Sequence, residues 1–513
     1  MNYRKLGQIL GKIMFLESIL LCFPLCISFI YKEDFRHMIS FIIPILLLAG
    51  IGALLQIPKP KRNNLYQKEG FALTTLVWVV MAAFGAIPFV INGDIPNYID
   101  ALFEIMSGFT TTGSSILSDI TALSHSSIFW RSFSHWIGGM GVLVFVLIFI
   151  PESDDGSAMH LLRAESPGPQ VGKLVSKMKA TTRILYLIYL VMTLLVAILL
   201  MFDAPIPGYE NDQWFISILT ACGCAGTGGF GVIPGSMELY HPFSQYVVAC
   251  SLLFFAVNFS LYYLILIGQI KSVLRSEELR TYAIIVAASV GIVFFSLVSG
   301  LWQIPQDYTT EEAFRHSLFQ VATLISTAGF STTDFNVWPM LAQTTLLITM
   351  AIGGMAGSTA GGIKVSRFVI AMKGAYINVR KLINPRYVPR SKIEGKTLES
   401  KVINDVFAYF TLYLFILLIT LLILSFDPVN GTTTTIVSDA GTYEVTHGFF
   451  SNFSAIVACL CNIGPGFEAV GAYSCFAGYS LLSKVVLTFA MMAGRLEILP
   501  VLILFSRRTW SKT

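Results

Sequence analysis

Charged side chains are scarce in this chain of 513 residues: Asp, Glu, Lys and Arg make up 12% of it, whereas hydrophobic residues make up 55%. With a mean hydropathy of +0.70, this composition lies far from that of an ordinary water-soluble domain. The charge-poor stretches recur from end to end. We therefore expect one integral membrane unit, in contact with the lipid bilayer along nearly its whole length and without a separate soluble domain.

The sequence also lacks the short motifs of common hydrolases and nucleotide-binding enzymes. It contains no His-Glu-x-x-His metal motif, no Gly-x-Ser-x-Gly turn and no phosphate-binding glycine loop that ends in Lys-Ser/Thr. Two Cys-x-Cys pairs are present, at 222/224 and 459/461, but no nearby His or further Cys completes a zinc set. We expect no enzyme activity, no organic cofactor and no nucleic-acid partner.

Ten stretches are long and apolar enough to cross a hydrocarbon core of ~30 Å, which needs about 20 residues in a helix. They cover residues 13–30, 39–57, 71–91, 128–150, 184–201, 247–270, 282–301, 341–372, 402–424 and 481–505. The eighth stretch contains five glycines within residues 353–362. Because a uniform helix disfavours such a run, we expect a break there.

Basic residues lie mainly on one side of the expected spans. Of the 34 Lys and Arg residues, 28 fall in the two termini and in segments 58–69, 152–183, 271–280 and 364–401. Since cytoplasmic loops carry the excess of basic residues, we expect both termini in the cytoplasm. The opposite loops are acidic, with Glu104, Asp334 and Glu468 among their carboxylates, and could concentrate cations at an outer mouth. The alternative is that these loops simply lack basic residues.

Four short segments share a glycine flanked by small or hydroxyl-bearing residues. They are 110–114 (Thr-Thr-Thr-Gly-Ser), 226–230 (Gly-Thr-Gly-Gly-Phe), 326–330 (Ser-Thr-Ala-Gly-Phe) and 462–466 (Asn-Ile-Gly-Pro-Gly). Each follows an apolar segment too short to span, near residues 99–109, 214–221, 314–325 and 450–460. Glycine lets backbone carbonyls turn toward a common axis, where a ring of carbonyls can replace the water shell of a cation. Four copies in one chain predict an ion pore that needs no tetramer.

These patterns predict an all-α membrane protein. Four repeated units of outer helix, pore loop and inner helix would surround one pore, preceded by an N-terminal two-helix hairpin. The expected boundaries are 1–66 for the hairpin and 67–160, 161–277, 278–390 and 391–513 for the four pore repeats. Non-helical backbone at membrane depth must be buried in protein or line a cavity, as such a pore provides.

This ordered set of motifs resembles the Trk/Ktr/HKT superfamily of potassium transporters, and the additional hairpin resembles its TrkH branch. Besides the four glycine segments, the matching runs are 135–141 (His-Trp-Ile-Gly-Gly-Met-Gly), 356–364 (Ala-Gly-Ser-Thr-Ala-Gly-Gly-Ile-Lys) and 494–497 (Gly-Arg-Leu-Glu). The resemblance implies potassium uptake across the bacterial inner membrane. It also implies a homodimer and a cytosolic TrkA-type nucleotide-binding subunit. The basic segment 364–401 would be the docking surface or, alternatively, a contact for anionic lipids.

The resemblance further implies a K⁺ selectivity filter and a gate. The filter residues would be Thr111, Thr112, Gly113, Gly228, Gly229, Thr327, Ala328, Gly329, Asn462, Ile463 and Gly464. Gly228 and Gly229 remain alternatives for the second filter glycine, and the following Phe230 favours Gly229. Glycine in all four repeats favours potassium over sodium. The gate would consist of Gly357, Ser358, Thr359, Ala360, Gly361 and Arg495.

Arg495 lies deep in the last apolar stretch, where a cation costs about 3 kcal/mol or more unless it faces water or a partner. Its charge beneath the filter would hinder a resting cation; the alternative is a structural ion pair with Glu497. An alternative function is Na⁺- or H⁺-coupled symport of potassium or another solute. Secondary transporters of that kind also use broken helices, but they usually consist of two related halves.

Overall fold

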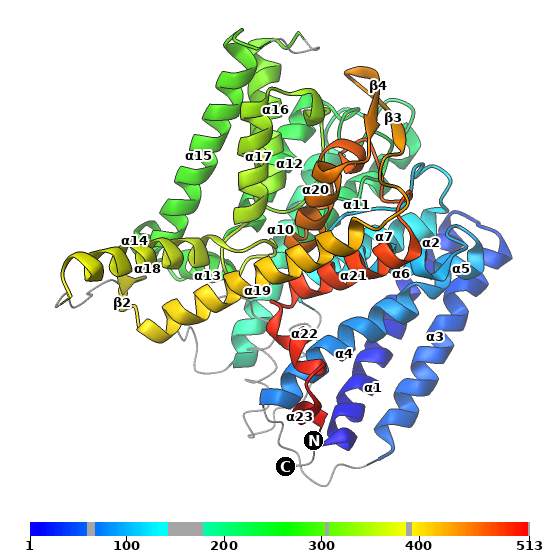
Figure 1. The fold of residues 1–513 in the computed structure, drawn as a ribbon. Helices are drawn as coiled ribbons and strands as arrows, with labels where there is room; N and C mark the ends of the chain where they lie inside the picture. The colour runs from blue at the N-terminus through cyan, green and yellow to red at the C-terminus, as the bar shows by residue number, and fades with distance from the viewer. Residues whose placement is uncertain (59–66, 142–177, 303–306, 386–391, 511–513) are drawn as a thin grey trace.

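The computed structural model describes residues 1–58, 67–141, 178–302, 307–385 and 392–510. Helices dominate this part of the chain, as the sequence predicts, and both termini lie together at one end of the molecule (Figure 1). Six of the described helices are long and apolar enough to cross a membrane, and one bent helix pair would make a seventh span. The protein is therefore a multi-pass helical membrane protein.

The N-terminal hairpin consists of α1 (Tyr3–Leu20), α2 (Cys22–Ile30) and α3 (Phe35–Gln56). α1 and α3 cross at two glycines that face each other. A Cβ atom on Gly11 would lie 2.6 Å from the Gly52 carbonyl oxygen, and one on Gly52 would lie 2.8 Å from the Gly11 carbonyl oxygen. Glycine at both positions lets the two backbones touch, as small residues do at helix crossings in membranes.

Each of the four repeats contains an outer helix, a half-helix and an inner helix in this order. The outer helices are α4 (Gln67–Gly85, continued by α5, Ile87–Asn92), α10 (Met178–Met201), α15 (Glu277–Val298) and α19 (Ser400–Leu424). The half-helices are α6 (Tyr98–Phe109), α11 (Gln213–Gly226), α16 (Thr310–Ile325) and α20 (Phe449–Cys461). The inner helices begin with α7 (His125–Gly139), α12 (Pro242–Phe255), α17 (Met340–Ile352) and α21 (Leu481–Arg495).

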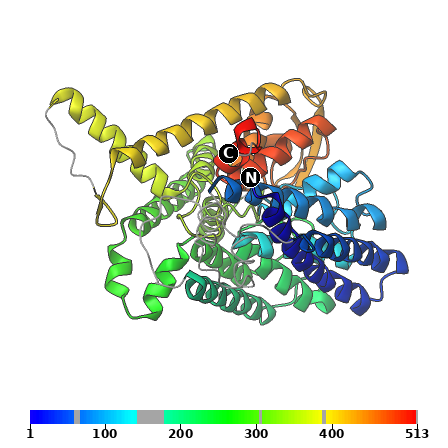
Figure 2. The same ribbon diagram turned by 90° about the horizontal axis from the view of Figure 1, so that it is seen from below.

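The repeats close around a common centre. Each half-helix contacts the inner helix of its own repeat and that of the preceding repeat: α6 contacts α7 and α21, α11 contacts α12 and α7, α16 contacts α17 and α12, and α20 contacts α21 and α17. Viewed from below, the repeats follow one another around the molecule from cyan through green and yellow to red (Figure 2). The apolar flanks of the half-helices form the core: Phe103, Leu219, Phe319 and Ile456 are almost completely buried.

The inner helices differ from the continuous spans predicted for them. Stretch 247–270 is split between α12 and α13 (Phe259–Leu266), which meet at 91°. Stretch 481–505 is split between α21 and α22 (Leu499–Leu504). Stretch 341–372 is split between α17 and α18 (Val365–Ile383), as its glycines predict. The first inner helix ends at Gly139, and the predicted stretch 128–150 continues beyond the described residues.

The remaining elements are short strands and helices. One antiparallel hairpin pairs β3 (Thr433–Ser438) with β4 (Gly441–Thr446) in the register Thr433↔Thr446, and another pairs β1 (Lys392–Ile393) with β2 (Lys396–Thr397). The sequence patterns predict no strands. The other short helices are α14 (Ile270–Arg275), α23 (Arg507–Trp510), η1 (Glu210–Asp212), η2 (Phe335–Val337) and η3 (Glu468–Val470). α18 projects from the side of the molecule in both views (Figures 1 and 2).

Candidate functional site

All four half-helices end in the same backbone turn. In the first repeat, Thr111 N donates to Gly108 O (3.0 Å) and Thr112 N donates to Ser107 O (2.8 Å). The same pair of bonds recurs with the donors Thr227 and Gly228, Thr327 and Ala328, and Asn462 and Ile463. This is the Schellman motif, which leads the chain out of a helix through one residue in the left-handed conformation.

The left-handed position is occupied by Thr111, Thr227, Thr327 and Asn462, whose φ angles are 53°, 52°, 58° and 57°. Glycine usually takes this position, and a residue with a side chain there costs about 1–3 kcal/mol. All four side chains are buried. Asn462 Nδ2 links the fourth repeat to the first by donating to Thr112 Oγ1 (2.9 Å), whereas Thr327 Oγ1 accepts from Gly361 N (2.5 Å) within the third repeat. A strained backbone residue therefore lies at the same point in all four glycine segments, where the chain leaves the half-helix.

Two residues after the left-handed residue, each repeat has a glycine that packs against the backbone of the next repeat. A Cβ atom would lie 2.8 Å from Gly229 N if built on Gly113, and 2.2 Å from Ala328 O if built on Gly229. A Cβ atom on Gly329 would lie 2.0 Å from Ile463 O, and one on Gly464 would lie 2.9 Å from Thr112 O. The contact of Gly464 leads from the fourth repeat back to the first, so the four glycine segments form a closed ring. In this register Gly229, not Gly228, is the equivalent of the other three glycines.

A buried ion pair supports the ring where the first and second repeats meet. Arg131 on α7 contacts Glu104 on α6 at 2.5 Å, and both side chains are at most 2% exposed. Glu104 also accepts from Ile116 N (3.0 Å), just after the first glycine segment. Arg131 donates to Gly231 O (2.9 Å) and lies 3.7 Å from the ring centre of Phe230. The pair therefore fixes the chain where it leaves the ring in both repeats.

The third and fourth repeats hold the outgoing chain with neutral side chains. Gln320 on α16 donates to Ser331 Oγ (3.0 Å), and Ser454 on α20 accepts from Phe467 N (2.9 Å). Each bond joins a half-helix to the segment that leaves the ring within the same repeat. Since all these partners are buried or nearly so, the bonds restrain the ring strongly.

His135 on α7 lies directly behind the second glycine segment. Its Nδ1 is 2.8 Å from Gly108 O at the end of α6, and its Nε2 accepts from Phe230 N (3.3 Å). A Cβ atom on Gly228 would lie 2.4 Å from the imidazole ring, so this residue must be glycine for a different reason from Gly229. The sequence shows the motif that begins at His135 but not its contact with Gly228, because these two residues are far apart in the chain.

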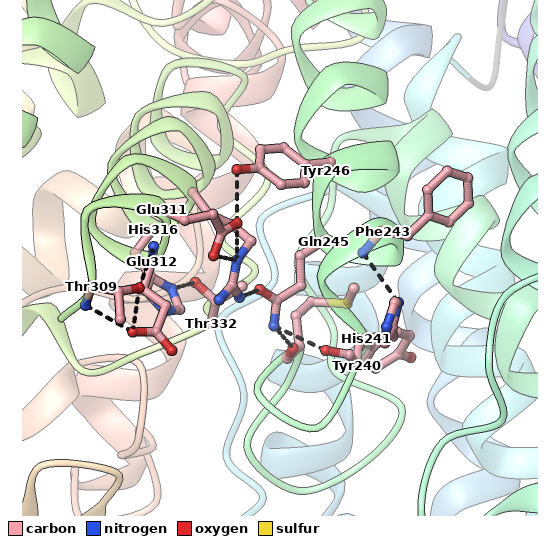
Figure 3. A network of polar contacts seen from close by, with 12 residues as sticks. Tyr240, His241, Phe243, Gln245, Tyr246, Thr309, Glu311, Glu312, His316 and Thr332 are labelled. Carbon is pink, nitrogen blue, oxygen red and sulfur yellow. Dashed lines mark hydrogen bonds and ion pairs between the residues drawn. The ribbon is translucent and has the colours of Figure 1, made fainter.

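A second polar network lies at the N-terminal ends of α12 and α16 (Figure 3). Arg315 donates to Gln245 Oε1 and pairs with Glu311 at 3.0 Å. Gln245 Nε2 donates to Met237 O (2.9 Å), and Tyr246 OH donates to Glu311 (3.0 Å). The network holds the loop that follows the second glycine segment against the third half-helix.

The glycine-rich loop 353–364 contacts the C-terminal ends of the third and fourth half-helices. Gly362 N donates to Cys461 O (2.9 Å), at the end of α20, next to the bond from Gly361 to Thr327. The loop also contacts the break in the second inner helix, because Met355 N donates to Ala256 O (3.0 Å) and Phe259 N donates to Gly357 O (3.0 Å). One loop of the third repeat therefore connects helix ends of repeats two, three and four beneath the ring.

Arg495, the last residue of α21, reaches this loop. Its Nη1 donates to Thr359 O (2.8 Å), and its Nη2 donates to Gly138 O (2.7 Å) and Gly139 O (2.8 Å) at the end of α7. Glu497, the alternative partner considered for it, forms an ion pair with Arg367 at 2.5 Å. The guanidinium thus links the inner-helix ends of repeats one and four to the loop.

Hydropathy alone does not predict the breaks in the second and fourth inner helices. Asn258 caps α13, since its side chain accepts from Ser260 N (2.8 Å), and an Asn within an apolar run is a usable helix-start signal. At the fourth break Glu497 and Ile498 both have positive φ angles, 61° and 63°. The Gly-Arg-Leu-Glu run there indicates buried charges but carries no signal for this backbone turn.

The loops predicted to form an acidic outer mouth contain fewer uncompensated carboxylates than the sequence suggests. Glu238 accepts from Tyr473 OH (2.9 Å), and Asp334 accepts from Tyr443 OH. Burial raises the pKa of both carboxyl groups above their usual range. Three other acidic residues are held in ion pairs with three of the outer basic residues, namely Asp100 with Lys484, Glu104 with Arg131 and Glu311 with Arg315.

A model of the TrkH family, described as cation transport proteins, matches residues 35–512. The chain belongs to the TrkH family. Among TrkH-family relatives, the Trk system potassium uptake protein TrkH of Salmonella typhimurium is 30% identical over 516 residues, covering 99% of this chain and 100% of that protein. The Trk system potassium uptake protein TrkG of Escherichia coli is 30% identical over 515 residues, covering 99% of both chains.

The crystal structure of the potassium transporter TrkH from Vibrio parahaemolyticus matches this chain with a TM-score of 0.82 at 27% identity, over 100% of both chains. The TrkH-family fold therefore extends over the whole chain, including the N-terminal hairpin. The family membership indicated by the motifs is confirmed.

Proposed function

We propose that this TrkH-family protein takes up potassium ions through the ring formed by its four glycine segments. The proposal is carried by one observation, the closed circuit of contacts in which each ring glycine packs against the backbone of the next repeat. The names of the relatives supply the ion. The proposed filter residues are Thr111, Thr112, Gly113, Gly228, Gly229, Thr327, Ala328, Gly329, Asn462, Ile463 and Gly464, with K⁺ as substrate.

In this proposal the carbonyl oxygens of Thr112, Gly228, Ala328 and Ile463 replace the water shell of the ion. Three of these carbonyl oxygens are those of Thr112, Ala328 and Ile463. A Cβ atom added to the neighbouring glycine of the ring would clash with each of them. Packing that close leaves the carbonyls little freedom to move inward. A ring whose spacing cannot contract favours K⁺ over the smaller Na⁺.

We propose that Gly357, Ser358, Thr359, Ala360, Gly361 and Arg495 form the gate. The loop supports this role because it joins helix ends of different repeats beneath the ring and is held there by hydrogen bonds rather than by a continuous helix. Arg495 adds a fixed positive charge beside Thr359. A cation that leaves the ring would meet both the loop and this charge, so conduction would require the loop to move.

The proposed setting is the inner membrane, with both termini in the cytoplasm and the four pore repeats divided at residues 67–160, 161–277, 278–390 and 391–513. A TrkA-type nucleotide-binding subunit would dock on the basic segment 364–401. A second copy of the chain would pack on the projecting α18 and α19, which expose large apolar side chains such as Met372, Val379, Phe415 and Ile419.

The alternative is coupled symport, in which Na⁺ or H⁺ drives the uptake. Potassium flux into liposomes that contain purified protein distinguishes the two, measured with a K⁺ gradient alone and then with an imposed Na⁺ or H⁺ gradient. We expect the K⁺ gradient and the membrane voltage to be sufficient. Flux that appears only with a Na⁺ or H⁺ gradient would replace this proposal by symport.

A further inference from the structure

A buried carboxylate holds both ends of the loop. Glu278, in the first turn of α15, is 8% exposed. Its Oε1 accepts from Ala356 N (2.7 Å), just before residues 357–361, and from Ser366 N (3.2 Å), just after the loop. One oxygen atom of the third outer helix thus contacts the backbone on both sides of the proposed gate.

The local sequence explains why a carboxylate is needed there. Lys364 precedes α18 at the N-cap position and makes no side-chain cap bond. Glu278 therefore supplies from another helix the acceptor that the first turn of α18 lacks, and a negative charge at a helix N-terminus is favourable. Hydrogen bonds to a charged acceptor are about twice as strong as neutral ones, so the carboxylate restrains the loop more than an amide would.

Glu278 is in turn held by the small β1–β2 hairpin. Glu394, at the turn of this hairpin, accepts from Glu278 N (3.0 Å) and from Ser276 Oγ (2.9 Å). Lys373 on α18 donates to Lys392 O (2.6 Å) in β1 and pairs with Glu277 at 2.5 Å. The hairpin is thus fixed to the first turn of α15, the turn that carries Glu278.

We propose that Glu278 is a positioning residue that latches the loop beneath the ring, and that the β1–β2 hairpin sets this latch through Glu394. The proposal rests on the proposed gating role of the loop. A protein that binds the hairpin and pulls Glu394 away would shift the first turn of α15. That shift would weaken the bonds from Glu278 to Ala356 and Ser366 and free the loop.

The main test is Glu278→Gln, which keeps the shape of the side chain but removes its charge. Basal K⁺ flux in liposomes without any partner protein should rise about tenfold or more, since bonds to a charged group are being weakened. Glu278→Asp should restore part of the wild-type restraint, and Glu394→Gln should give a smaller rise. Glu399→Gln is the control, because Glu399 is exposed and makes no cap bond at the start of α19; its flux should equal that of wild type.

A second readout follows the loop itself. Ser358→Cys is introduced into wild type and into each variant, and its modification by a thiol reagent is timed, with the protein lacking this change as background. The rate at which the thiol reagent modifies Ser358→Cys should rise in Glu278→Gln and Glu394→Gln but not in Glu399→Gln. A general loss of stability in a single variant would not produce this pattern. If Glu278→Gln does not fold, Glu394→Gln is the deciding variant. An unchanged labelling rate of Ser358→Cys together with an unchanged K⁺ flux in that variant would overturn the latch proposal.

Deletion of residues 357–361 separates this proposal from the one on which it rests. If the deletion raises flux but Glu278→Gln changes neither flux nor the labelling of Ser358→Cys, the loop is a gate and the latch is wrong. If the deletion leaves the flux of a folded protein unchanged, the gating role itself fails, and Glu278 is then only a helix cap.

Discussion

The ring and the loop beneath it are both non-helical backbone at membrane depth, but they are held in different ways. In the ring, backbone packs directly on backbone, and the outgoing segments are fixed by buried side chains such as Glu104 and Gln320. The loop is held by a few hydrogen bonds from side chains of other helices, including Glu278 and Arg495. Contacts of the first kind permit one arrangement, whereas bonds of the second kind can be released one at a time. In the proposed function, the ring would be the rigid selective element and the loop would be the movable gate.

The largest effect should come from filling the ring. Gly329→Ala would place a Cβ atom 2.0 Å from Ile463 O at a residue whose φ is 96°, so the backbone of two repeats must shift. We expect K⁺ uptake to fall by about a hundredfold or more, equivalent to about 2.7 kcal/mol. Complementation of growth at low K⁺ and liposome flux measure this loss.

Gly291→Ala is the matched control, because a Cβ atom there has no neighbour within 4 Å. Gly291 lies within α15, so this substitution should leave uptake unchanged and stabilise the helix by about 0.5–1 kcal/mol. Normal K⁺ uptake and selectivity in Gly329→Ala would mean that the ring is not the selective element.

The next effect concerns the side chains behind the ring. Glu104→Gln leaves Arg131 buried without its carboxylate, and such a loss typically costs about 3–5 kcal/mol. We expect early thermal unfolding of the detergent-solubilised protein, together with weaker discrimination of K⁺ from Na⁺. Glu311→Gln is the comparison, since Glu311 is 55% exposed and its pair with Arg315 should contribute less than about 1 kcal/mol. Equal melting temperatures for the two variants would contradict a rigidly clamped ring.

A smaller change, of opposite sign, is expected at the loop. Arg495→Ala removes a positive charge and three backbone contacts, so flux should rise about tenfold while selectivity, which depends on the ring, is retained. Flux and melting temperature are measured on the same preparation. A destabilised protein without a flux gain would show that Arg495 is only a structural support.

The smallest effect should lie at the outer mouth. Because burial raises the pKa of Glu238 and Asp334, these groups bind protons at a higher pH than ordinary carboxylates. The mouth therefore loses negative charge as the pH falls, and uptake at low ionic strength should decline about twofold with it. Glu238→Gln should reduce this pH dependence, and about 1 M salt should abolish it by screening. A pH response that persists at high salt would place its origin elsewhere.

Much of the fold could be predicted because it depends on local sequence. The half-helices α6, α16 and α20 begin and end close to the predicted residues, since each is a short apolar run before a glycine segment. The break at residues 353–362 was predicted for the same reason, as glycines disfavour a uniform helix. The breaks after Phe255 and Arg495 are not predicted, because contacts that support them come from other repeats: Ala256 O accepts from Met355 N of the third repeat, and the Arg495 side chain donates to Gly138 O and Gly139 O of the first.

Amino-acid order by itself determined that this is a membrane protein with four related units, and it placed a glycine in each unit where backbones would have to approach. It left open whether Gly228 or Gly229 belongs to the ring, and it said nothing of Glu278. Only the tertiary structure decided these points. The register of the ring depends on which carbonyl of the next repeat each glycine meets, and the restraint of the loop depends on a carboxylate nearly eighty residues away in the chain. Contacts between residues so distant in sequence leave no periodic pattern, so packing alone reveals them.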